Sequence, residues 1–292
     1  MLCYYSIVTR EPRAAREDKR RYTEIKLMTE EDSIMKKQLA VLLGAVMAAG
    51  MTMPAFAEES MVYAVEAGSA GEAAAEENGF EYTSVTSQAD ALMEVASGTS
   101  DAAIIDLLMA GAMIGEGTSY PDLIHTDELT TEEYGVGCRK DSDLAAYINA
   151  VFAETYADGT MKEVAEKYGV QESLVEQKEA EAAEPAEDGD VASIQSKGTL
   201  IIGITDFAPM DYKGEDGEWI GFDADMARIV AEKLGVEIEF VEIDWDNKIM
   251  ELNAGTIDVV WNGMTLTDEV KGAMECTNAY CNNAQVVVVP AE

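Results

Sequence analysis

Acidic and aromatic side chains follow several apolar segments of the sequence, where they could meet a ligand. Asp106 ends the apolar run Ala102–Ile105, and its carboxylate would either cap the following helix or hold a cation such as an ammonium group. Phe207 and Trp245 each lie just past a predicted strand. Either ring alone could cover the core as well as stack on a ligand, but two rings at one mouth favour a binding site.

Two short segments offer hydrogen-bond donors to a negatively charged ligand group. Residues 262–265 read Asn-Gly-Met-Thr, which provides backbone N–H groups and a hydroxyl. Residues 68–71 read Gly-Ser-Ala-Gly and lead into a predicted helix, whose N-terminus could seat an anion or a carboxylate. A tight strand-to-helix turn needs glycine in any case, so the second segment alone does not establish a site.

The composition excludes several kinds of chemistry. The 292 residues include one histidine, His125, and four cysteines without a C-x-x-C pair. We therefore expect no metal site, no cofactor and no Ser-His or Cys-His catalysis. Residues 1–57 hold 9 of the 20 Lys and Arg and 7 of the 57 Asp and Glu, so residues 58–292 carry a formal charge of −39. Such a field repels nucleic acid and anionic membrane surfaces.

Residues 35–57 have the pattern of a secretory signal peptide. A short basic start after Met35 precedes an apolar run and a small-residue cleavage site ending at Ala57. No cysteine lies near that site, so we expect an exported, soluble product without a lipid anchor, in the periplasm or at the cell exterior. The exported part keeps Cys138, Cys276 and Cys281. The last two are near enough in sequence to form a disulfide, although buried thiols fit equally well.

Two similar helix–glycine–strand units predict two related α/β lobes. Residues 91–106 and 248–263 align without gaps and share Met, Glu, Gly, Thr and Asp. Each reads as a helix that ends at a left-handed glycine, Gly98 or Gly255, followed by a buried strand. A chance likeness between two common units is the alternative. Residues 171–195 between the halves are acidic, Ala-rich and free of aromatic residues, which is the composition of a flexible linker.

Alternating strand and helix patterns predict an α/β fold with mostly parallel sheets flanked by helices. Strands are expected at 62–65, 199–204 and 236–240, with crossover helices between neighbouring strands. The helix that follows Gly221 is expected to have Asp223 as its N-cap. Ligands of open α/β sheets lie beyond the carboxyl ends of the strands. The loops expected at a site are therefore 66–71, 106–110, 205–212, 244–247 and 262–270.

In combination, these motifs resemble the family-3 (polar amino acid type) solute-binding proteins of ABC transporters. Residues 196–290 are similar to the first lobe of that family, through Gly-Ile-Thr-Asp-Phe-Ala-Pro-Met-Asp-Tyr and Gly-Phe-Asp-Ala-Asp-Met-Ala. Residues 61–139 are similar to its second lobe, and residues 141–170 to its closing helices. The first lobe comes last here, which is the order of a circular permutation. The resemblance implies a two-lobed periplasmic-binding-protein type II fold.

The expected organisation is a series of six segments. They are an untranslated or disordered extension (1–34), the signal peptide (35–57), a second-lobe-like α/β domain (58–136), the hinge and closing helices (137–170), the acidic linker (171–195) and a first-lobe-like α/β domain (196–292). One covalent crossing between the lobes is expected near 134–139, with the ends of the exported chain beside the hinge. We expect a monomer, with a domain-swapped dimer as the alternative.

The resemblance implies a non-enzymatic receptor that captures a small zwitterionic or cationic solute, with amino acids as the first candidates, and delivers it to an ABC transporter permease. The positions that match the family's ligand contacts are Phe207, Trp245, Gly263, Thr265, Ser69, Ala70 and Asp106. Asp206, beside the aromatic pair, adds negative charge to the expected site. Where the family usually has an arginine that anchors the ligand carboxylate, this chain has Val270.

Two other functions remain open on the sequence. The first is an enzyme on the same scaffold, such as a dehydratase, with Asp106 and Glu66 as acid and base. The second is a sensory ligand-binding module. Saturable binding without turnover would distinguish a receptor from an enzyme.

Overall fold

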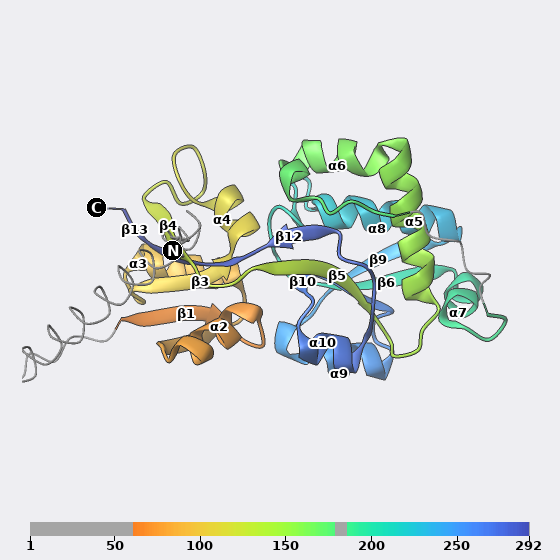
Figure 1. Ribbon diagram of the computed structural model, residues 1–292, viewed down its shortest axis with the longest axis horizontal. Coiled ribbons are helices and arrows are strands. Elements are labelled where there is room, and N and C mark those ends of the chain that lie inside the picture. Colours follow the sequence, from red (N-terminus) through yellow and green to blue (C-terminus); the bar gives the residue numbers. More distant parts are fainter. Residues whose placement is uncertain (1–60, 179–185, 292) are drawn as a thin grey trace, which may run out of the picture. The chain divides into compact units, whose positions relative to one another are not determined.

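The computed structural model describes residues 61–178 and 186–291, which contain two mixed α/β lobes (Figure 1). The predicted upstream extension and signal peptide lie outside the described residues, so the structure does not bear on them. We name the lobes A and B after their sheets. None of the helices within the described ranges is long and apolar enough to cross a membrane.

Lobe A is built on a five-stranded sheet in the order β2-β1-β3-β13-β4. Strands β1, β2 and β3 pair parallel, and β13 lies antiparallel between β3 and β4. Its elements are β1 (Val62–Glu66), α2 (Ala70–Asn78), β2 (Glu81–Val85), α3 (Gln88–Ser97), β3 (Ala102–Asp106), α4 (Leu107–Met113), β4 (Leu123–Glu128) and β13 (Gln285–Pro290).

Lobe B is built on a sheet in the order β11-β5-β10-β6-β9, with β12 also paired to β5. Strands β10, β6 and β9 are parallel, whereas β5 runs antiparallel to β10. Its strands are β5 (Glu132–Cys138), β6 (Thr199–Ile204), β9 (Glu237–Glu242), β10 (Val259–Thr265), β11 (Glu275–Cys276) and β12 (Cys281–Asn283), with a small ribbon of β7 (Tyr212–Lys213) and β8 (Trp219–Ile220). Its helices are α5 (Leu144–Asp158), α6 (Thr160–Tyr168), η2 (Gln171–Ser173), α7 (Asp190–Lys197), α8 (Phe222–Leu234), η3 (Trp245–Asn247), α9 (Lys248–Ala254) and α10 (Asp268–Ala273).

The two repeated units form as predicted. Helices α3 and α9 end at Gly98 and Gly255, which have left-handed φ angles of 74° and 75°. A residue without a Cβ takes this conformation at little cost, so the glycine ends the helix and turns the chain toward the next strand. All five residues of β3 and all but the last of β10 are buried. The α/β, two-lobed fold expected from the sequence is confirmed.

Two chain segments join the lobes, not one. The chain passes from β4 to β5 between Glu128 and Glu132, and from β12 to β13 between Asn283 and Gln285 (Figure 1). The assignment of all of 196–292 to one lobe is therefore wrong, as is the single crossing. The physical reason is the valine run of β13, whose buried residues pair with β3 on one side and β4 on the other.

The described chain ends lie away from the joining segments. Val62 accepts a hydrogen bond from the N–H of Asp101 at 3.0 Å, just before β3 begins. Pro290 pairs with Leu123 at the start of β4. Both residues thus lie at the amino-terminal edge of the parallel strands of lobe A. The expected position of the chain ends beside the hinge is wrong, because β13 carries the chain across the lobe.

The predicted linker is largely structured at both ends. Val175 donates its N–H to the carbonyl of Tyr280 at 2.9 Å, and Gln177 is buried. Residues 190–197 form helix α7, which buries Val191 and Ile194. The averaged composition of the segment hid these two apolar positions, whose spacing suits one face of a helix. Of the segment 171–195, only residues 179–185 lie outside the described structure.

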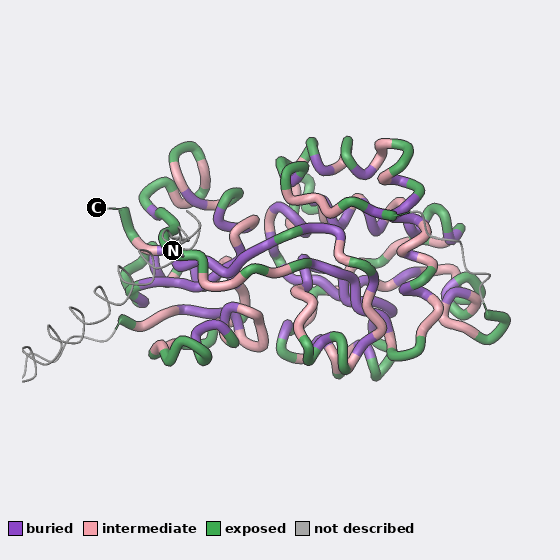
Figure 2. Tube along the Cα trace, viewed as in Figure 1, coloured by how far each residue is buried: buried purple, intermediate pink, exposed green. Residues whose placement is uncertain are grey.

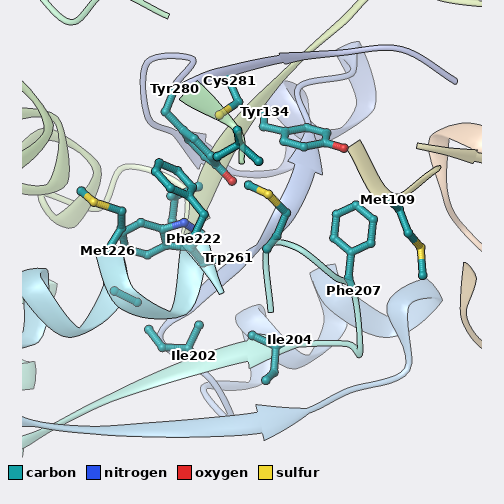
Figure 3. Packing of buried hydrophobic residues seen from close by; sticks show 14 of the residues in the cluster. Met109, Tyr134, Ile202, Ile204, Phe207, Phe222, Met226, Trp261, Tyr280 and Cys281 are labelled. Carbon is teal, nitrogen blue, oxygen red and sulfur yellow. The ribbon is translucent and has the colours of Figure 1, made fainter. Parts of the chain in front are cut away.

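Buried side chains follow both sheets and the helix faces against them (Figure 2). In lobe B, Trp261 meets Phe152 edge-on with ring centroids 5.6 Å apart. Phe222 stacks on Tyr280 with ring centroids 5.9 Å apart, as Figure 3 shows. Phe152 belongs to α5, so these contacts hold a predicted closing helix against the sheet of lobe B. The cysteines Cys138, Cys276 and Cys281 are not in disulfides, and the first and last are buried.

Candidate functional site

A cavity of about 290 Å³ lies at the carboxyl ends of the parallel strands, with both lobes in its lining. All five loops expected at a site contribute residues to it. Seven of the eight predicted ligand contacts line this cavity: Ser69, Ala70, Asp106, Phe207, Trp245, Gly263 and Thr265. Asp206 does not. Its side chain is exposed, and its pKa is raised by partial burial and by Glu242, with Lys213 opposing.

The two aromatic residues are both core residues and cavity walls. Phe207 is buried in the main core and meets Tyr134 edge-on, with ring centroids 6.4 Å apart (Figure 3). A Cβ on Gly263 would lie 2.3 Å from Cε1 of Phe207, and Gly263 has a φ of 56°. The wall therefore requires glycine at this position. Each ring therefore covers the core, as one of the two expected roles requires, and also lines the cavity, while its contact with a ligand stays a prediction.

Val270 belongs to the apolar side of the cavity. It is buried in a cluster with Trp245 and Met264, and it lines the cavity itself. A guanidinium group at this position would have been able to bind a carboxylate through two parallel hydrogen bonds. An isopropyl group offers no polar contact. This wall therefore suits an apolar part of a ligand and not its carboxylate.

Asp106 is held by neutral donors from three separate segments. Its Oδ1 accepts from the hydroxyl of Tyr134 at 2.5 Å and from the amide of Asn283, and its Oδ2 accepts from the amide of Gln88 at 2.5 Å. Burial and the nearby Glu132 raise the pKa of Asp106 to about 6, and the hydrogen bonds from Tyr134 and Gln88 oppose the shift. Asp106 stands at the N-cap position of α4 but makes no capping hydrogen bond. Of the two roles left open by the sequence, helix capping is excluded by this geometry.

Glu66 is a second buried carboxyl group in the cavity lining. It ends β1, the strand next to β3, and is 4% exposed, as is Asp106. Among the described residues, its Oε1 has no hydrogen-bond partner. Burial and repulsion by Asp106 raise the pKa of Glu66 to about 8, while Gln88 and Lys248 oppose the shift. The lining thus contains a carboxyl group that is mostly neutral at pH 7 and has a free acceptor atom.

The donors expected for a ligand carboxylate already bind carboxylates of the protein. The N–H of Gly263 donates to Asp223 at 2.6 Å, and the hydroxyl of Thr265 donates to Glu132 at 2.9 Å. The N–H of Gly68, at the start of the glycine loop, donates to Glu72 at 2.8 Å. Ser69 caps α2 through its side chain, as its Oγ accepts from the N–H of Glu72 at 3.2 Å. These contacts reduce the capacity of the cavity for an anion.

Lys248 supplies the positive charge of the lining. Its ammonium group donates to the carbonyl oxygens of Gly68 at 2.8 Å and Trp245 at 3.2 Å, so it connects the two lobes. Burial lowers the pKa of Lys248, with the acids around it opposing. Against this one base the lining contains four acidic residues, Glu66, Asp106, Asp268 and Glu269. The lining thus contains more acidic than basic side chains.

Several of these residues were not singled out from the sequence. Glu66 carries the same signal as Asp106, an acid at the end of a buried strand, and could have been found in that way. Gln88, Tyr134 and Asn283 carry no such local signal. Asp223 does not cap α8, because Gly221 is the N-cap and Asp223 lies buried within the helix. Within the described ranges, no group of three His, Cys, Asp or Glu residues is arranged to hold a metal ion.

Comparison with known proteins gives matches to part of the chain. The model of "Bacterial extracellular solute-binding proteins, family 3" matches residues 200–292. The L-cystine-binding protein TcyJ of Escherichia coli (strain K12) is 32% identical over 96 residues, which are 32% of this chain and 36% of that protein. A probable histidine-binding protein of Neisseria gonorrhoeae is 34% identical over 109 residues, 37% of this chain and 38% of that protein.

Two further matches cover similar shares of the chain. The arginine-binding extracellular protein ArtP of Bacillus subtilis (strain 168) is 34% identical over 97 residues, 33% of this chain and 38% of that protein. A solved structure of an ABC uptake transporter substrate-binding protein from Streptococcus pneumoniae with bound histidine is 39% identical, covering 30% of this chain and 36% of that one. Its TM-score of 0.29 supports no inference about this protein. The chain spans little more than a third of the length of the curated relatives it matches.

The segment matched by the family model lies in β6 and the residues after it, and it includes Phe207, Trp245, Gly263 and Thr265. This segment contributes the lobe B wall of the cavity. Residues 200–292 are thus similar to the family-3 bacterial extracellular solute-binding proteins.

Proposed function

We propose that the protein is an exported receptor that captures a small zwitterionic or cationic solute, an amino acid or a related amine, between lobes A and B. It would deliver this solute to an ABC transporter permease and act as a monomer without catalysing a reaction. The relatives are named as binding proteins for cystine, histidine and arginine. Export is proposed from the family, whose description is extracellular, and from the signal-peptide pattern.

The observation that carries the proposal is the shared cavity. Its volume of about 290 Å³ is at the lower end of the range for small-molecule pockets, about 300–1,000 Å³. Two aromatic rings and the buried carboxyl groups face the same space, so a ligand can combine ring contacts with an ionic contact. An ammonium group beside Asp106 would donate a charge-assisted hydrogen bond to its carboxylate in a setting with little water. Acidic amino acids should bind poorly.

A thermal-shift screen of amino acids, amines and small peptides tests the proposal. A ligand at 100 times its dissociation constant should stabilise the folded state by about 2.7 kcal/mol through mass action. Calorimetry on each positive compound should then give saturable binding with one site for each chain. The proposal fails if no compound in the panel raises the melting temperature, or if glutamate is among the tightest ligands.

One observation favours an enzyme as the second candidate. Glu66 and Asp106 are buried carboxyl groups in one cavity, with raised pKa values of about 8 and about 6. Two such groups could act as an acid and a base. Mass spectrometry of each binding compound after long incubation decides between the candidates. Unchanged compounds support the receptor, whereas conversion that is lost in both Glu66→Gln and Asp106→Asn would establish an enzyme.

A further inference from the structure

Glu66 stands apart from the other carboxyl groups around the cavity because part of it is unsatisfied. Asp106 accepts hydrogen bonds on both oxygens, and Glu132 accepts from Thr265, Asn283 and Gln285. Asp268 and Glu269 are exposed at the rim. Glu66 is 4% exposed, and its Oε1 accepts no hydrogen bond from any described residue. A buried acceptor without a donor is costly unless something satisfies it.

Glu66 and Asp106 are two neighbouring carboxyl groups, and each could bind a different positively charged group of one ligand. The two residues end the neighbouring strands β1 and β3, and both face the cavity. An α-ammonium group of the ligand would bind Asp106 and leave Glu66 available. Lys248 is the cation whose charge acts on Glu66, but its ammonium group is already bound to the carbonyl oxygens of Gly68 and Trp245. Glu66 therefore remains able to receive a second donor from a ligand.

We propose that Glu66 is a specificity residue that pairs with a second cationic group of the ligand, so that the site prefers diamino compounds to monoamino ones. This inference rests on the proposed function, because it assigns a ligand class to the same cavity. Hydrogen bonds to ionised groups are about twice as strong as those between neutral groups. Without such a cation the carboxyl group stays mostly protonated and offers the ligand only a hydrogen bond between neutral groups. Ligands that lack the second cation should therefore bind more weakly.

Binding of a cationic group to Glu66 should also change the protonation state of this carboxyl group. The charged groups that act on Glu66 are Asp106 and Asp244, which disfavour its ionisation, and Lys248, which favours it, with burial as the largest effect. A pKa of about 8 leaves the carboxyl group mostly protonated at pH 7. When a ligand ammonium group docks, the carboxyl group ionises and its proton passes to the buffer. The ligand keeps its own proton, so binding should release close to one proton per site.

The test compares two ligands of equal size. L-ornithine and L-norleucine differ only in a terminal ammonium group in place of a methyl group. Calorimetry at pH 7 should show at least tenfold tighter binding of ornithine to the wild-type protein. Repeating the titration in phosphate and in Tris, whose ionisation enthalpies differ, measures the protons released. Glu66→Gln should abolish both the preference and the proton release, while norleucine affinity changes less than threefold.

Controls separate this inference from the function on which it rests. Glu116→Gln removes the same charge from an exposed loop residue of lobe A that does not line the cavity, and it should keep the preference. Equal binding of the two ligands by the wild type would overturn the inference. So would a preference or a proton release that survives Glu66→Gln, or a screen whose tightest ligands carry no second cation. If no amino acid or amine binds at all, the proposed function itself fails. Binding of 1,4-diaminobutane would show that the diamine suffices without a carboxylate.

Discussion

Among the described residues, two groups of buried carboxylic acids have raised pKa values, and only one of these groups faces the cavity. Glu66 and Asp106 line it. Asp211 and Asp223 in lobe B are fully buried and do not. In both groups burial is the largest cause of a raised pKa, which reaches about 8 for Glu66 and about 7 for Asp223. A raised pKa therefore does not by itself mark a binding site. Access to a cavity is what makes a buried carboxyl group available to a solute.

Asp211 and Asp223, which we call the sealed pair because neither lines the cavity, belong to the core of lobe B. Asp223 accepts from the hydroxyl of Tyr280 at 2.7 Å and from the N–H of Gly263 at 2.6 Å. Asp211 has no side-chain hydrogen bond to the described residues, and burial and Asp223 raise its pKa well above the usual range. Gly263 also lines the cavity, so this one residue connects the sealed pair to the site.

Gly263→Ala should have the largest effect, because it disturbs both groups. The left-handed φ of 56° costs a non-glycine residue about 1–2 kcal/mol, and the new Cβ would meet Phe207 at 2.3 Å. With the added cost of overpacking, we expect a loss of about 3 kcal/mol in the free energy of unfolding. Urea unfolding measures this loss. A loss under about 1 kcal/mol would mean that Phe207 can move, and that the cavity wall is not rigid.

Asp106→Asn should weaken ligand binding through the cavity group alone. If Asp106 holds a ligand ammonium group, the loss should be at least about 1.5 kcal/mol, roughly tenfold in the dissociation constant. Calorimetry with the tightest compound of the thermal-shift screen measures the change. Asp211→Asn is the matched control in the sealed pair and should leave affinity within twofold. Equal losses in the two variants would remove the distinction between the groups.

Asp211→Asn should instead change how stability depends on pH. The folded pKa values of Asp211 and Asp223 lie above the ordinary value, so the folded protein holds protons that the unfolded chain releases. Their contribution to stability is full below about pH 4 and is lost as the pH rises through about 7 for Asp223. The amide removes one of these groups without breaking a side-chain hydrogen bond. We expect the variant to be more stable than wild type by about 1 kcal/mol at pH 8.

Urea midpoints from pH 5 to pH 8 test this expectation. The slope of stability against pH should be shallower in Asp211→Asn than in the wild type. Saturating ligand should flatten the remaining slope, because it would compensate the charge of Glu66 and Asp106 but cannot reach the sealed pair. An unchanged slope in the variant would show that the protons come from elsewhere.

The smallest effect should follow from restoring the lobe order of the family, which we propose is permuted here. Val62 and Pro290 lie at the same edge of the lobe A sheet. The variant would begin at residue 186, run to residue 291, continue through a short Gly-Ser loop into residue 61 and end at residue 178. It keeps every described contact of Glu66 and Asp106 and of the sealed pair. Its free energy of unfolding should lie within about 1 kcal/mol of the wild type, since loop closure depends only weakly on length. Loss of folding or of ligand binding would contradict the proposed permutation.

The sequence by itself determined the local units of this protein. The buried strand Ala102–Asp106 and the helix-ending glycines Gly98 and Gly255 follow from apolar runs and left-handed backbone, which neighbouring residues specify. The loops at the strand ends could be named in advance, because the edge at which ligands bind is set by the parallel α/β arrangement. These properties depend on residues a few positions apart.

Only the tertiary structure decided which distant residues share a site and which sheet a strand joins. The valine run of β13 is apolar on both faces and would fit the interior of either sheet, so its place between β3 and β4 could not be inferred from its pattern. Asp206 lies outside the cavity although it is next to Phe207 in the sequence. Gly263 and Thr265 are paired with acids 40 and 133 residues away. Hydrogen-bond satisfaction of this kind depends on contacts between remote segments, and it occupied two donors that the sequence had offered to a ligand carboxylate.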